Sequence, residues 1–101
     1  MIYAITCFAK CEKDNRGWFH SAGQRTFGFF HEKHNAIQAL HTNESDMREC
    51  TYDFAVIEAL HEGIHCEVEE EIWFQWDETK QGFYEIQKPD ATYGTCNFAL
   101  G

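Results

Sequence analysis

The chain has 101 residues, of which 44% are hydrophobic and 16% aromatic, and its seventeen acidic and eight basic side chains give a net charge of −9. This length suits a single domain, residues 1–101, with one core, and this composition excludes a disordered chain. The acidic charge repels phosphates, which excludes binding to duplex nucleic acid. Because no membrane span and no phosphate or nucleophile motif is visible, we expect no membrane contact and no cofactor.

The five cysteines are scattered along the chain and form no Cys-x-x-Cys pair. A secreted disulfide framework normally uses an even number of cysteines, and the first nine residues lack the basic start and the cleavage site of a secretory signal. We therefore expect reduced thiols and a cytoplasmic protein, in the host cell cytoplasm if a phage encodes it. The cysteines are Cys7, Cys11, Cys50, Cys66 and Cys96.

The first half of the chain predicts two strands followed by a helix. Segments 2–9 and 24–31 are rich in β-branched and aromatic residues, as is typical of strands, and Gly28 indicates a β-bulge in the second. The charged segment 10–23 contains two glycines and predicts a loop. In segment 31–42 the apolar residues recur at helical spacing, which predicts a short helix.

Segment 54–60 has two interpretations. As a helix, it would place Phe54, Ile57 and His61 on one stripe. As a strand, it alternates between two faces, and the β-branched pair Val56-Ile57 together with the turn signal Glu62-Gly63 favours this interpretation.

Segments 72–76 and 83–88 predict two further strands, joined by a hairpin turn over residues 77–82. The order β-β-α-β-β-β predicts an α+β fold, in which a small antiparallel or mixed sheet carries one helix packed on a face. We also expect a homo-oligomer, because so small a sheet with so many aromatic side chains leaves an apolar face uncovered.

The segment between the first two strands is the best candidate for a ligand-binding site. Basic side chains suit phosphates and aromatic rings stack on bases, and ligand sites concentrate on loops that rigid strands hold. In the alternative interpretation, the aromatic pair seals the sheet edge while the lysines are solvated. The candidate residues are Lys10, Lys13, Arg16, Trp18, Phe19 and Arg25.

The sequence His61-Glu62-Gly63-Ile64-His65 matches H-E-x-x-H, a spacing that on a helix lets two histidines bind zinc while the glutamate activates water. In a chain of this composition the pattern arises by chance roughly once in twenty-five sequences, so the match is weak. Gly63 would cost about 1 kcal/mol inside a helix. We therefore predict no catalytic residue and no metal site, and keep a zinc-dependent hydrolase using His61 and His65 as an alternative.

The glutamates of segment 67–71 predict a solvated turn or a strand edge that discourages aggregation between sheets. In the sharper interpretation, this acidic surface, with Glu69, Glu70 and Glu71 at its centre, contacts a protein partner.

Five patterns carry a family resemblance: Tyr52-x-x-Ala55-Val56-Ile57-Glu58, Glu62-Gly63, Trp73-Phe74-x-Trp76, Tyr84-x-x-Ile86-x-x-Pro89 and Asn97-Phe98-x-x-Gly101. Through them the second half of the chain resembles small proteins of Firmicutes phages, prophages and other mobile elements. The shared residues are of core and turn types, so the resemblance implies a fold and gives no residue an enzymatic role. Phage genes of this size often encode counter-defence proteins.

By this analogy we expect a non-enzymatic binding protein. It would act as a sponge that sequesters a nucleotide immune signal, a small anionic ligand such as a cyclic nucleotide. Alternatively, it would inhibit a host defence protein by binding it through the acidic surface.

Overall fold

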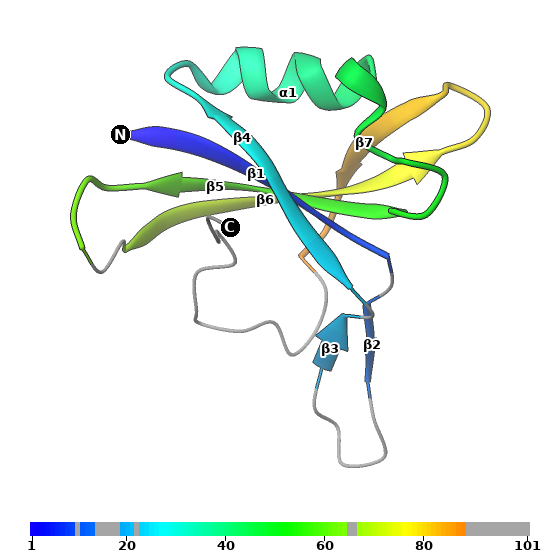
Figure 1. Ribbon diagram of the computed structural model, residues 1–101, viewed down its shortest axis with the longest axis horizontal. Helices are drawn as coiled ribbons and strands as arrows, with labels where there is room; N and C mark the ends of the chain where they lie inside the picture. Colours follow the sequence, from blue (N-terminus) through cyan, green and yellow to red (C-terminus); the bar gives the residue numbers. More distant parts are fainter. Residues whose placement is uncertain (10, 14–18, 22, 65–66, 89–101) are drawn as a thin grey trace.

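The computed structural model describes residues 1–9, 11–13, 19–21, 23–64 and 67–88, with only the backbone of 11–13 and 19–21. Strands β4, β1, β5, β6 and β7 form one five-stranded sheet in that order, every neighbouring pair is antiparallel, and helix α1 lies across one face (Figure 1). The predicted α+β fold with one helix on a small sheet is thus confirmed. The elements are β1 (Ile2–Phe8), β2 (Cys11–Lys13), β3 (Phe19–Ser21), β4 (Gln24–Phe30), α1 (Lys33–His41), the 3₁₀ turn η1 (Glu44–Asp46), β5 (Phe54–Leu60), β6 (Val68–Asp77) and β7 (Gly82–Ile86).

Strand β5 lies in the middle of the sheet, which decides between the two interpretations of segment 54–60. It pairs with β1 on one side, from Ile2–Leu60 to Phe8–Phe54, and with β6 on the other. A strand that is buried on both faces has a nearly continuous apolar sequence, so its run resembles a buried helix. The strand prediction is confirmed and the helical alternative is wrong.

Segment 10–23, predicted as a loop, contains a second small sheet. Strands β2 and β3 pair with each other and project away from the main sheet between β1 and β4 (Figure 1). The loop prediction is therefore wrong for the described residues of this segment. Strands of three residues are too short to show an alternating pattern, so the charges and glycines dominated the sequence signal.

The predicted bulge at Gly28 is confirmed. In the β1–β4 ladder, Thr6 pairs with Thr26 and Ile5 with Gly28, so Phe27 is the extra residue. The bulge changes which face the following side chains take. Phe27 and Phe30 both pack against the core beneath α1, whereas Phe29 is 52% exposed.

The main core lies between α1 and the sheet. Ala36, Ala39 and Leu40 bring the apolar stripe of the helix against both central and edge strands. At the helix end the packing is close, because a Cβ on Gly82 would lie 2.0 Å from the carbonyl oxygen of His41. Glycine at the start of β7 is therefore needed for the helix to approach the β6–β7 hairpin. The sheet contributes Ile5, Cys7, Ala55, Ile57, Phe74 and Phe83 to this core.

The second face of the sheet is buried as well. Phe8 and Trp73 stack there with ring centroids 5.5 Å apart, and each is 1% exposed. The prediction of a homo-oligomer assumed an uncovered apolar face, but the large hydrophobic residues exposed in the described part of the chain are only Met1, Phe29 and Ile64. Oligomerisation stays a prediction without this support. The described helix α1 is too short to cross a membrane.

Candidate functional site

The structure places the described members of the predicted ligand-binding set in three strands, β2, β3 and β4. Lys10, Arg16 and Trp18 lie outside the described residues. Lys13 and Phe19 are Cα partners across the β2–β3 hairpin. Arg25, in β4, is not a free cation.

The guanidinium of Arg25 is already engaged on two sides. Its Nη1 donates to Oε2 of Glu49 at 2.9 Å, and its Cζ lies 4.9 Å from the centroid of the Phe27 ring. An anionic ligand would share this cation with the Glu49 carboxylate, which repels it.

The zinc motif does not lie on a helix. His61 directly follows β5, residues 62–64 form a bend, and His65 lies outside the described residues. The imidazole Nε2 of His61 pairs with Glu69 across the β5–β6 connection. No three His, Cys, Asp or Glu side chains gather as a metal site anywhere in the part of the chain that the structure describes.

The glutamates of segment 67–71 form an edge and not a turn. Strand β6 begins at Val68, while its last pair with β7 joins Trp73 to Ile86. The residues before Trp73 therefore pair with β5 on one side and with no described strand on the other. Here Glu70 binds Lys33 and Glu71 binds Lys88 at 2.6 Å, and both ion pairs line an open notch of about 520 Å³.

Every Lys or Arg whose side chain is described contacts a carboxylate or an aromatic ring. Arg48 contacts Asp53 at 3.1 Å and Glu78 at 3.6 Å, and its Cζ lies 4.5 Å from the Trp76 ring. The ammonium of Lys80 lies 4.5 Å from the ring centroid of Tyr84. The described surface thus offers no unengaged Lys or Arg.

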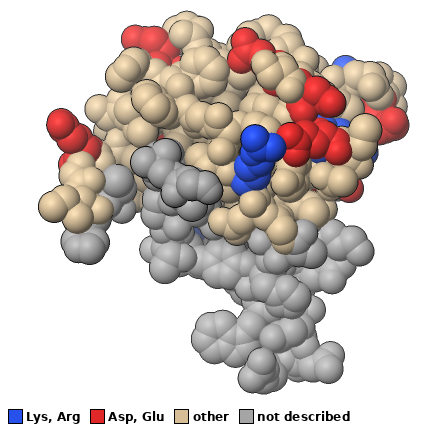
Figure 2. Space-filling model, in the orientation of Figure 1, with Lys and Arg blue, Asp and Glu red and all other residues tan. Residues whose placement is uncertain are grey.

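Some carboxylates, in contrast, have no partner among the described residues. Five exposed glutamates have no hydrogen bond or ion pair through their side chains with any described residue. In Figure 2 acidic side chains lie around the rim of the molecule, and the basic ones lie beside acidic ones. The described surface is therefore anionic beyond its ion pairs. Glu69, Glu70 and Glu71, the predicted centre of the acidic surface, are all paired, so the acidic surface is from here on the set of exposed glutamates without a described partner. The five residues are Glu32, Glu44, Glu62, Glu67 and Glu85.

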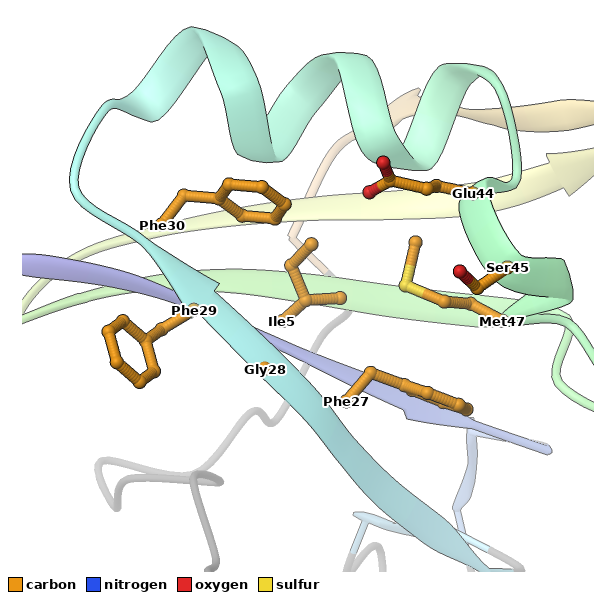
Figure 3. Close-up of a pocket in the computed structure, with 8 residues that line it drawn as sticks. All are labelled: Ile5, Phe27, Gly28, Phe29, Phe30, Glu44, Ser45 and Met47. Carbon is orange, nitrogen blue, oxygen red and sulfur yellow. The ribbon is translucent and has the colours of Figure 1, made fainter.

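One of these glutamates stands at the mouth of a cavity of about 280 Å³ between β4 and the connection that follows α1 (Figure 3). The buried side chains of Ile5 and Met47 line this cavity. Phe30 points into the space beneath α1, and the carboxylate of Glu44 points toward the same space from the connection. Phe27 and Gly28 of the bulge complete the lining, together with Phe29, whose ring points away.

The connection that carries Glu44 has an unusual backbone. Asn43, Ser45 and Asp46 all have φ between 50° and 55°, a left-handed conformation that costs L residues on the order of 1–2 kcal/mol each. The side chain of Asn43 holds the turn, because its Oδ1 accepts the backbone N–H of Arg48 at 3.0 Å and its Nδ2 donates to Asp46 at 3.2 Å. Strain of this kind is tolerated where surrounding contacts fix it, as they do here.

Sequence reasoning missed this cavity. Glu, Ser and Asp, which begin this connection, are typical of solvated loops and do not indicate a cavity wall. Asn and Asp tolerate the left-handed region better than other L residues, so Asn43 and Asp46 were the available signal. No spacing rule relates them to the bulge in β4, which forms the other wall.

No family model, curated protein or solved structure matches this chain. The resemblance to small proteins of phages and mobile elements therefore stays a prediction. Of the residues that carry it, Pro89, Asn97, Phe98 and Gly101 lie outside the described part. Function has to be argued from the surface and the cavity themselves.

Proposed function

We propose that this chain is a non-enzymatic binding protein of phage or mobile-element type that binds a basic protein partner through its acidic surface. Such a protein would act as an inhibitor of a host defence protein. The observation that carries the proposal is the charge distribution: the described cations are all engaged, while five exposed carboxylates have no hydrogen bond or ion pair with a described residue. A surface of this kind attracts basic partners and speeds their association at low salt.

The nucleotide-binding function expected from the sequence is the second candidate. It is supported by the β2–β3 hairpin, whose backbone makes a basic residue, Lys13, the Cα partner of an aromatic one, Phe19. It is weakened by Arg25, the one candidate residue with a described side chain, because Glu49 already occupies that cation. The acidic surface is therefore the better supported site.

Salt-graded affinity capture from a Firmicutes cell lysate tests the proposal. Immobilised protein should retain a basic protein at about 0.1 M salt and lose it at about 1 M, where the screening length falls from about 10 Å to about 3 Å. The variant Glu32→Gln/Glu62→Gln/Glu85→Gln removes three free carboxylates and should retain less of that protein. The variant Gln38→Ala/Thr79→Ala/Gln87→Ala changes three exposed uncharged residues and should retain as much as the wild type.

Native mass spectrometry of the purified protein separates the two candidates. A nucleotide that co-purifies with the chain, together with equal retention of lysate proteins by both triple variants, would contradict the proposal and favour the nucleotide sponge. Purified protein without a bound nucleotide, together with retention of a lysate protein that depends on the three glutamates, supports the basic protein partner.

A further inference from the structure

The cavity beneath α1 combines apolar walls with a carboxylate that has no partner among the described residues. Ile5 and Met47 are 1% and 5% exposed, and the ring of Phe30 faces them across the cavity (Figure 3). The carboxylate of Glu44 points toward this space and contacts no cation among the described residues. We propose that this cavity binds an organic ammonium group carried on an apolar stem, with Glu44 as its counter-ion.

The charge of the ligand follows from what lines the cavity. No Lys, Arg or His is among the lining residues, so an anion would meet only the carboxylate of Glu44. An ammonium group would be attracted by that carboxylate.

The apolar stem follows from the size and the depth of the cavity. A volume of about 280 Å³ is just below the usual range for drug-sized ligands, so it suits a small amine or one inserted side chain. The stem would lie against Ile5 and Met47 and remove apolar surface from water. A purely apolar ligand would desolvate Glu44 without compensation, which disfavours it.

The backbone that carries Glu44 is held in place before any ligand arrives. Glu44 lies between Asn43 and Ser45, both left-handed, and the Asn43 side chain ties this turn to the N–H of Arg48. A fixed turn loses little conformational freedom on binding, which favours affinity.

Two sources share this chemistry, a free amine and a lysine side chain of a protein. The lysine source rests on the proposed function, since it needs a basic protein partner, whereas the free amine does not. Phenethylammonium and N-acetyl-lysine methylamide are the corresponding probes, and binding of either supports the site. Failure of the capture experiment above leaves this titration unaffected, so the two proposals fail separately.

Methyl NMR of protein labelled at the methionine methyl groups tests the inference directly. The chain has two methionines, Met47 in the cavity and Met1 at the exposed N-terminus. Phenethylammonium should shift the Met47 methyl signal and not that of Met1, with a Kd on the order of 1 mM for a ligand of about nine non-hydrogen atoms. It should bind about tenfold more tightly than 2-phenylethanol, which has the same shape without the charge.

Two matched variants complete the test. Glu44→Gln keeps the shape of the side chain and should abolish the tenfold preference, whereas Glu67→Gln removes a free carboxylate away from the cavity and should keep it. Equal affinity of wild-type protein for the amine and the alcohol, or a preference that survives Glu44→Gln, would overturn the proposal. So would the absence of a Met47 shift with both amine probes.

Discussion

Replacing Gly82 by alanine adds one methyl group at the point where α1 meets the β6–β7 hairpin. The new Cβ would lie 2.0 Å from the carbonyl oxygen and 2.9 Å from the carbonyl carbon of His41. Both atoms belong to the backbone, so a rotamer change cannot relieve the overlap, and the helix end or the hairpin has to move by about 1 Å. Overpacking of this kind costs about 1–3 kcal/mol, and the upper half of that range is expected here.

A loss of about 2–3 kcal/mol is a large part of the stability of a small domain, about 5–15 kcal/mol. At roughly 4–8 °C per kcal/mol for a domain of this size, Gly82→Ala should lower the Tm by roughly 10–20 °C. Thermal unfolding followed by circular dichroism and urea unfolding give the two values independently.

Gly28→Ala is the matched control, because a Cβ built on Gly28 has no atom within 4 Å. Alanine is favoured over glycine inside a strand by roughly 0.5–1 kcal/mol, so this variant should be as stable as the wild type or slightly more stable. If Gly82→Ala unfolded within about 2 °C of Gly28→Ala, the close approach of helix and hairpin would be refuted.

Three further outcomes are expected. Thr6→Val removes a 2.9 Å hydrogen bond between the hydroxyls of Thr6 and Thr26. It should lower the free energy of unfolding, measured by urea titration, by about 1 kcal/mol. A double-mutant cycle with Thr26→Val isolates the contribution of the pair. Burial raises the pKa of the Cys7 thiol to about 12. Iodoacetamide should therefore modify Cys7 at pH 8 only in unfolded protein, which peptide mapping would reveal. Modification of Cys7 in the native protein would contradict this. The hydrogen bond with Glu70 raises the pKa of Lys33 above 10.5. This pair therefore stabilises the fold below pH 10.5, and its contribution is lost as the pH rises through the raised pKa. Glu70→Gln should lower the pKa of Lys33 in an NMR titration, and an unchanged pKa would exclude the pair.

The fold could be predicted because its strands have distinct local patterns. The apolar run of segment 54–60 suits either a central strand or a buried helix. Its β-branched residues favoured the strand, which is what the structure contains. The glycine in β4 indicated the bulge, because a glycine inside a strand pattern often lies at or beside one, and here the extra residue is the neighbouring Phe27.

Other parts of the structure depend on contacts between distant residues. Three consecutive glutamates have little intrinsic preference for a strand, and β6 extends over them because Lys33, His61 and Lys88 come from other elements to pair with them. The candidate cavity likewise needs β4 and the connection after α1 to face each other. No local signal encodes that arrangement, and so the sequence directed attention to the basic segment 10–25 instead.

The position of β1 in the sheet has a consequence for how fast the protein folds. Strand β1 comes first in the chain yet lies between β4 and β5, so its ladder with β5 pairs Ile2 with Leu60, at opposite ends of more than half the chain. The β6–β7 hairpin can form locally, whereas this ladder requires a long loop to close before its contacts compensate the lost chain entropy. Joining the N-terminal strand to the C-terminal meander should therefore be the slow step, and until it occurs the apolar edge of β5 is exposed to pairing with other chains.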